Sequence, residues 1–263
     1  MDLAIKTEHL TKRFSPPPSL GRFFPGRRAD SAIVAVDRVN LEIERGTVFT
    51  LLGANGAGKT TLVRILSTLI LPTSGSANVN GYDVLTEAEQ AKASIGLVTG
   101  EGRGFFVRLT CRENLRFFGA LHGLWRAMVE ERISELTRVL GLEEFLGRRY
   151  DRCSTGMKQR LAIARSLLHE PEIIFMDEPT RGLDPSASRN LRACIRYLAR
   201  EKMQTVFLIT HQLDEARELG DQVGVMHQGR LRVFDPGAVG LGQVFADFPL
   251  EGRDEFGESH SLH

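Results

Sequence analysis

The sequence has no long hydrophobic run, almost no net charge and few cysteines. No stretch approaches the roughly 20 consecutive apolar residues that a membrane-spanning helix requires, and no signal peptide begins at Met1. We therefore expect the chain to stay in the cytoplasm unless a partner holds it elsewhere. Its formal net charge of +1 gives no overall field that would attract nucleic acid or an acidic membrane surface.

Cysteine usage excludes two further kinds of site. The three cysteines, Cys111, Cys153 and Cys194, are odd in number and share no metal-ligand spacing. This pattern suits a reducing cytosol, and we expect neither a zinc site nor a disulfide. The rest of the composition is that of an ordinary globular chain. Its 263 residues, 42% hydrophobic and 25% charged, are enough for a large core and two lobes.

A glycine-rich segment in the first quarter of the chain fits the phosphate-binding pattern G-x-x-x-x-G-K-[ST]. It follows a short β-branched and aromatic run at 47–52 and precedes apolar residues at helical spacing over 62–69. Glycines in such a loop let backbone N–H groups and a helix N-terminus converge on an anion. Lys59 would reach the β- and γ-phosphates of a nucleotide, and the Thr60 hydroxyl would bind Mg²⁺. The nucleotide-binding residues predicted here are Gly53, Asn55, Gly56, Ala57, Gly58, Lys59, Thr60 and Thr61.

The remaining pattern alternates short buried strands with helices. Strands are predicted over 1–14, 39–43, 94–99, 173–177, 206–210 and 222–226, and helices after Gly156 and over 185–202 and 212–219. Two amphipathic helices between about 110 and 149 indicate a second, all-helical lobe. The alternation predicts an α/β fold with a mainly parallel sheet, whose ligand lies at the carboxyl ends of the strands.

Two other segments do not fit regular structure. Residues 15–31 are rich in Pro, Gly and Arg, and we expect a solvated insertion there. Its arginines and Phe23-Phe24 would also suit contact with lipid or a partner. The tail 241–263 is expected to be frayed.

A pair of carboxylates ends the buried strand at 173–177. Successive side chains on a strand alternate between faces, so Asp177 and Glu178 must have different roles. With the phosphate loop on a neighbouring strand, Asp177 would hold Mg²⁺, and Glu178 would polarise the attacking water as a general base. His211 ends another strand, where its imidazole would contact the γ-phosphate and hold that water.

Five motifs, which follow one another along the chain in the order typical of the family, resemble those of the nucleotide-binding subunits of ABC transporters. The resemblance covers residues 1 to about 235. Segment 53–61 is similar to their Walker A loop, 173–178 to Walker B with its catalytic glutamate, and His211 to their switch histidine. Segment 154–160 resembles the family signature and 182–184 the D-loop. The resemblance implies a P-loop NTPase of ABC ATPase type over 1–240. It would have a mainly parallel sheet core, an antiparallel β subdomain and a helical subdomain at about 103–158.

The resemblance also implies a mechanism. ATP is sandwiched between two subunits in this family, with the Walker A loop of one subunit facing the signature of the other. Lys59, Glu178 and His211 would then be catalytic, while Ser154, Gly156 and Asp184 would complete the nucleotide site of a second ATP-binding subunit. A plain helix N-cap is the alternative role for Ser154.

Phe14 matches the aromatic residue that stacks on adenine in the family, although Phe23 and Phe24 are possible substitutes. The assignment is open because the insertion follows Phe14 directly.

The sequence departs from the family pattern at two of its motifs. The signature reads Cys-Ser-Thr-Gly-Met at 153–157, where Leu-Ser-Gly-Gly-Gln is commonest, so the serine and the second glycine are kept. The segment 99–103 reads Thr-Gly-Glu-Gly-Arg, where the family has a glutamine that touches Mg²⁺ and water. Glu101 is a candidate replacement as a metal ligand, with a solvated loop carboxylate as the alternative.

The segment at 108–115, the Ser-Thr-Gly-Met signature and the D-loop at 181–184 look most like the subgroup that powers exporters of drugs, lipids or polysaccharides. That resemblance implies a separate transmembrane permease, which would hold the subunit at the cytoplasmic face of the plasma membrane. The helical lobe and the 99–103 loop would receive the cytoplasmic coupling helix of the permease. The second subunit would be an identical or a similar chain. A soluble ABC ATPase acting on ribosomes or DNA, and an importer subunit, are the alternatives.

Overall fold

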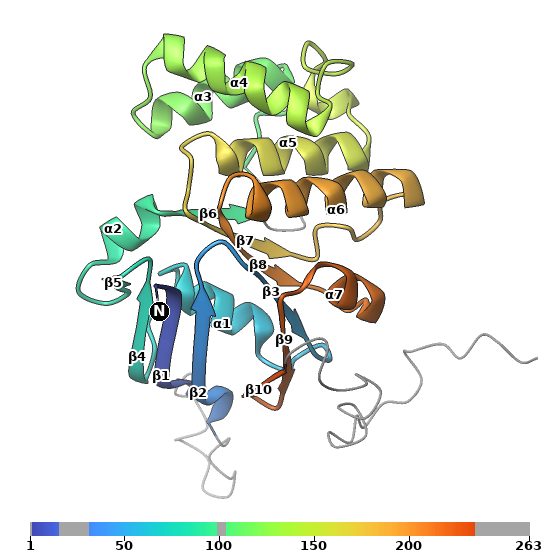
Figure 1. Cartoon of the computed structure of the whole chain (residues 1–263). Helices are drawn as coiled ribbons and strands as arrows, with labels where there is room; N and C mark the ends of the chain where they lie inside the picture. The colour runs from blue at the N-terminus through green and yellow to red at the C-terminus, as the bar shows by residue number, and fades with distance from the viewer. Residues whose placement is uncertain (1, 16–31, 99–103, 235–263) are drawn as a thin grey trace, which may run out of the picture.

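The computed structural model describes residues 2–15, 32–98 and 104–234. Its strands form two sheets, a larger one in the order β10-β9-β3-β8-β7-β6 and a smaller one in the order β2-β1-β4-β5 (Figure 1). The strands are β1 (Leu3–Phe14), β2 (Ile33–Glu44), β3 (Val48–Leu52), β4 (Ser74–Val79), β5 (Tyr82–Asp83), β6 (Ile95–Val98), β7 (Ile173–Asp177), β8 (Thr205–Ile209), β9 (Gln222–His227) and β10 (Arg230–Phe234).

The larger sheet is parallel except for β10, which pairs antiparallel with β9 through the turn at Gln228 and Gly229. Strands β3 and β8 are buried at every position, as expected for a parallel sheet covered on both faces. β8 lies between β3 and β7, so the expectation that the phosphate loop and the carboxylate pair follow adjacent strands is wrong. They still reach one edge, because all parallel strands end on the same side.

Alternation along the strands divides the core between the two faces of this sheet. Ile173, Phe175 and Phe207 join the cluster that contains helix α1 and the smaller sheet, whereas Ile174 and Val206 join the cluster that contains α5 and α6. The helices are α1 (Lys59–Leu66), α2 (Ala88–Ala93), α3 (Cys111–Leu121), α4 (Arg126–Leu140), α5 (Thr155–Leu167), α6 (Pro185–Arg200) and α7 (Leu213–Leu219). A short 3-10 helix, η2, covers Tyr150–Arg152.

In two of the predicted helices, the last leucine of the apolar spacing is exposed instead of buried. Helix α1 ends at Leu66, Thr68 has the left-handed φ of 59°, and Leu69 is 59% exposed instead of buried. Leu121, at the end of α3, is 66% exposed. Strand β2 begins at Ile33, six residues before the predicted start at 39, whereas the other predicted strands and helices have boundaries close to those of the structure. In the smaller sheet, β1 pairs with β2 so that Phe14 lies opposite Ile33. Most of the predicted insertion, 16–31, and the tail 241–263 lie outside the described residues.

Helices α3 and α4 pack beside α5 as a separate lobe on one side of the larger sheet (Figure 1). Asn114 is fully buried at its base. Its side chain accepts a hydrogen bond from the Phe106 amide at 2.8 Å and donates to the Phe106 and Thr110 carbonyls at 3.1 and 3.0 Å. Asn114 thereby joins the segment before α3 to the helix itself. Among the helices of the described residues, none has the length and hydrophobicity needed to span a bilayer.

All three cysteines are buried, and none of them is joined in a disulfide. Cys111 begins α3 and Cys153 directly precedes the signature serine, and their Sγ atoms lie 3.4 Å apart although 42 residues separate them. Burial, together with the neighbouring Cys153 sulfur, raises the pKa of Cys111 to about 12. A thiol that is protonated at neutral pH is a poor nucleophile, so Cys111 serves as packing between the lobe and the signature segment.

Replacing Asn114 should therefore loosen the helical lobe. The Asn114→Ala substitution leaves the partly buried Phe106 amide without its acceptor, and we expect the free energy of unfolding to fall by about 1–3 kcal/mol. Thermal unfolding followed by circular dichroism measures the loss. The matched control is Glu131→Ala at an exposed position of α4, which should melt with the wild type. Equal melting of all three proteins would contradict the role given to Asn114.

Candidate functional site

The glycine loop follows β3 and is closely packed by the backbone of two other strands. Gly53 has a φ of 153°, and a Cβ atom there would lie 2.3 Å from the Met226 carbonyl oxygen in β9. Gly58 has a φ of 109°, and its Cβ would lie 2.1 Å from the Ala35 carbonyl oxygen in β2. The Ala57 carbonyl also accepts a hydrogen bond from Gly229 at 2.9 Å. Glycine is therefore required at 53 and 58 for both conformation and space.

Lys59 is the first residue of α1 and lies inside the curve of the loop. Its Nζ donates hydrogen bonds to the Gly53 and Ala54 carbonyls at 2.6 and 2.9 Å, and the residue is only 7% exposed. The pKa of Lys59 lies below its ordinary value, because the effect of burial exceeds the opposing effect of the Glu178 and Asp177 charges. The N-cap residue of α1 is Gly58, which offers no side-chain cap to the first N–H groups of the helix. An ammonium group and free helical N–H groups at one point suit a phosphate.

Asp177 ends β7 close to the start of α1. Its Oδ2 lies 3.5 Å from the Thr60 hydroxyl, at the outer limit of a hydrogen bond. Burial and the adjacent Glu178 raise the pKa of Asp177, and Lys59 opposes them. A divalent cation beside this half-buried carboxylate would stabilise its charged form. The carboxylate and hydroxyl oxygens are ligands that Mg²⁺ accepts, so the residues present fit that ion.

Glu178 lies just beyond β7 and has the left-handed φ of 49°, so the turn and not strand alternation separates it from Asp177. The prediction that alternation along one strand separates the two side chains is therefore wrong. Its Oε1 lies 3.6 Å from His211 Nδ1, and its Oε2 accepts a hydrogen bond from Arg181 at 3.0 Å. Its side chain is 17% exposed. A carboxylate and an imidazole therefore face each other at the sheet edge that also holds the glycine loop. Arg181 is a neighbour that the sequence patterns did not indicate.

His211 reaches this edge because β8 pairs with β7. Asp177 lies opposite Ile209 in the register, and Thr210 and His211 follow directly. The His211 side chain is 49% exposed, which leaves its ring accessible to a ligand. The structure therefore brings Lys59, Thr60, Asp177, Glu178 and His211 together.

The signature and D-loop residues lie on other elements. Ser154 is the N-cap of α5, and its hydroxyl accepts a hydrogen bond from the Met157 amide at 3.3 Å. Gly156 faces Leu183 of the D-loop, since a Cβ there would lie 3.6 Å from Leu183 Cδ2. Asp184 caps α6 by accepting hydrogen bonds from the amides of Ser186 and Ala187. Both Ser154 and Asp184 thus cap helices, and their roles toward a nucleotide stay predictions.

Phe14 is 42% exposed at the end of β1, and the Lys12 ammonium lies 5.1 Å from the centre of its ring. The ring is accessible to a ligand, and its role toward adenine stays a prediction. The two alternatives Phe23 and Phe24, and the candidate metal ligand Glu101, lie outside the described residues.

Comparison with known proteins identifies the family of the chain. A family model described as "ABC transporter" matches residues 36–181. The chain is 40% identical over 199 residues to the ABC transporter ATP-binding protein NatA of Bacillus subtilis, covering 76% of this chain and 80% of that protein. It is 37% identical over 231 residues to the bacitracin transport ATP-binding protein BcrA of Bacillus licheniformis, covering 88% and 69%.

A third relative and a solved structure agree with this match. The daunorubicin resistance ATP-binding protein DrrA3 of Streptomyces coeruleorubidus is 42% identical over 197 residues, covering 75% of this chain and 62% of that protein. The dimeric structure of MJ0796, a bacterial ABC transporter cassette, superposes with a TM-score of 0.77 at 26% identity and covers 89% of this chain and 100% of that one. Together with the loop, carboxylates and histidine at one sheet edge, these matches confirm the predicted fold and show that the chain belongs to the ABC transporter family, as an ATP-binding subunit that hydrolyses ATP.

Proposed function

We propose that this subunit hydrolyses ATP to drive export through a separate transmembrane permease at the cytoplasmic face of the membrane. The observation that carries the ATPase chemistry is the meeting of Lys59, Asp177, Glu178 and His211 at one edge of the sheet. Export is supported by relatives named for bacitracin transport and daunorubicin resistance.

In the proposed mechanism, Lys59 and the N-terminus of α1 bind the β- and γ-phosphates of ATP. Glu178 accepts a proton from a water molecule, whose oxygen attacks the γ-phosphorus while the bond to the ADP oxygen breaks. His211, 3.6 Å from the Glu178 carboxylate, orients that water and carboxylate. Thr60 and Asp177 would hold Mg²⁺, and Glu101 is proposed as a further ligand; the ion would neutralise charge on the phosphates.

A second ATP-binding subunit completes the site in this proposal. Ser154 and Gly156 stand at the start of α5, and Asp184 at the start of α6, in positions where exposed N-terminal groups of one chain could face the glycine loop of another. The dimeric structure of the similar cassette MJ0796 supports this arrangement. Phe14 is the proposed adenine-stacking residue.

A group of exposed apolar side chains on the helical lobe supports a membrane partner. Phe106 and Phe117 are 46% and 38% exposed, with ring centres 4.6 Å apart. Leu121 follows Phe117 by one helical turn, and Trp125 and Met128 are 81% and 48% exposed further along the lobe. We propose that this permease-facing surface, made of Phe106, Val107, Phe117, Leu121, Trp125 and Met128, receives the coupling helix of the permease.

Glu178 can be tested by an isosteric change. Glu178→Gln keeps the shape of the side chain and removes the base, so we expect the rate of ATP hydrolysis to fall by about 10²–10⁴-fold while ATP binding persists. Phosphate release measures turnover, a fluorescent ATP analogue measures binding, and sedimentation velocity should show an ATP-dependent dimer. Glu172→Gln, at the other end of β7, is the control. Wild-type turnover by Glu178→Gln would refute the assignment.

The metal ligand can be tested through the Mg²⁺ dependence of hydrolysis. Asp177→Asn removes the charge that the ion would balance, so the Mg²⁺ concentration giving half-maximal turnover should rise about tenfold or more. Titration of Mg²⁺ at saturating ATP measures this shift. An unchanged Mg²⁺ requirement, in a variant that folds and binds ATP, would argue against Asp177 as a ligand.

The permease-facing surface can be tested by fractionation. Phe106→Ser combined with Phe117→Ser should reduce recovery of the subunit with membranes that contain a co-expressed partner permease. The ATPase rate of the isolated subunit should stay within about twofold, because both rings are lobe residues away from the sheet edge. Leu69→Ser with Leu71→Ser removes two exposed leucines outside the lobe, 59% and 63% exposed, and is the matched control. Recovery with ribosomes in place of membranes would contradict transport.

A further inference from the structure

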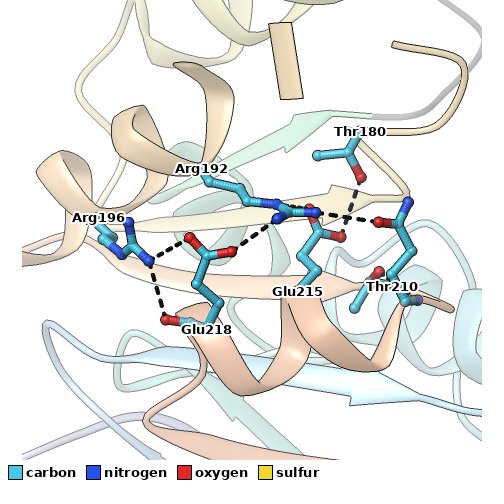
Figure 2. A network of polar contacts seen from close by, with 7 residues as sticks. Thr180, Arg192, Arg196, Thr210, Glu215 and Glu218 are labelled. Atoms are coloured by element: carbon cyan, nitrogen blue, oxygen red, sulfur yellow. Dashed lines mark hydrogen bonds and ion pairs between the residues drawn. The ribbon is translucent and has the colours of Figure 1, made fainter. Parts of the chain in front are cut away.

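A fully buried carboxylate lies behind the catalytic edge of the sheet. Glu215, in the first turn of α7, has 0% exposure, and none of the sequence motifs points to it. Its Oε2 accepts a hydrogen bond from the Thr180 hydroxyl at 3.2 Å, and its Oε1 lies 3.5 Å from Nε of Arg192. Figure 2 shows Arg192 of α6 reaching across to Glu215 and Glu218 of α7. Thr180 lies above the Glu215 carboxylate in this view.

Glu215 and Arg192 together contact two further segments of the site, and Arg192 itself lies in a third. Thr180 is 4% exposed and stands two residues after Glu178. Arg192 stands about two turns into α6, the helix that Asp184 of the D-loop caps. The Arg192 guanidinium also donates to the side chain of Gln212 at 3.2 Å, and Gln212 directly follows His211.

The contact between Glu178 and His211 depends on the position of both segments. Their 3.6 Å approach joins residues on two separate strand ends. The strand pairing fixes Asp177 opposite Ile209, and the Glu178 amide still donates to the Ile209 carbonyl at 3.0 Å. Glu178 then enters a left-handed turn and His211 lies beyond Thr210, so the strand pairing does not set the direction of either side chain. Through Thr180, Glu215 holds the segment that carries Glu178. Through Gln212, Arg192 holds the segment that carries His211.

Stability alone is a weak reason for this arrangement. The free energy needed to remove a carboxylate and a guanidinium from water offsets much of the attraction between them. Apolar residues of similar volume often give the same stability. A buried pair of this kind is useful where it fixes one geometry. We propose that Glu215 and Arg192 form a positioning pair that sets the distance between the Glu178 carboxylate and the His211 imidazole and ties both to helix α6. This inference rests on the proposed roles of Glu178 and His211.

The first test removes the charge and keeps the shape. Glu215→Gln should lower kcat for ATP about tenfold while the KM for ATP changes by less than about twofold, because no partner of Glu215 belongs to the glycine loop. Glu130→Gln is the control: it is a glutamate paired with Arg112 and Arg116 in the helical lobe, and its kcat should match the wild type. A folded Glu215→Gln protein with wild-type kcat, or with only a raised KM, would overturn the proposal.

The second test concerns Thr180, whose removal leaves the ion pair in place. Thr180→Val has the same shape without the hydroxyl and should lower kcat about threefold to tenfold, whereas Thr180→Ser keeps the donor and should restore most of the rate. If Glu215→Gln does not fold, this pair of variants decides. Equal rates for Thr180→Val and Thr180→Ser would overturn the proposal.

A double-mutant comparison separates positioning from general loosening of the structure. If Glu215 acts through Glu178, adding Glu215→Gln to Glu178→Gln should change the residual rate by less than about twofold. A full additional tenfold loss would show that Glu215 acts elsewhere. Wild-type turnover by Glu178→Gln itself would instead refute the general base. Loss of turnover in Glu178→Gln, with unchanged rates in folded Glu215→Gln and Thr180→Val, would refute the positioning pair alone.

Discussion

The arrangement of the site depends on the position of β8 in the centre of the parallel sheet. Ile209, its last residue, pairs with Leu51 of β3 on one side and with Asp177 of β7 on the other. One residue thereby aligns the strand that leads into the glycine loop with the strand that leads into the carboxylates. His211 follows two positions later at the same edge. A slip of one residue in either pairing would turn every buried side chain of that strand to the other face, so the register is strongly fixed.

Much of the fold and part of the site could be predicted from the sequence. The glycine loop, the apolar strand ending in Asp177 and Glu178, and His211 are local patterns, and the structure brings them together. The position of β8 between β3 and β7 could not be predicted, because apolar runs of this kind show that a strand is buried but not which strand lies beside it.

Contacts between distant residues were also missed. Thr180 and Glu215 are 35 residues apart, and a threonine in a loop and a glutamate in a short helix read as solvated residues in any sequence pattern. Likewise, Cys111 and Cys153 share no recognisable spacing, yet their sulfur atoms are in contact beneath the signature segment. In both cases tertiary structure buries a polar or polarisable group that local periodicity cannot place. Ser154 differs from these cases. Its N-cap hydrogen bond lies within one chain, whereas its predicted role toward a nucleotide involves a second chain.

The tight packing of the glycine loop also affects the order in which the site can form during synthesis. Gly53 rests on the Met226 carbonyl, and Ala57 accepts a hydrogen bond from Gly229, both in the hairpin of β9 and β10. A nascent chain that already carries the whole loop and α1, which ends at Leu66, lacks this support until about 160 further residues have been translated. The phosphate-binding loop is thus encoded early but completed late, and a chain interrupted before β9 would contain the motif without the surface that shapes it.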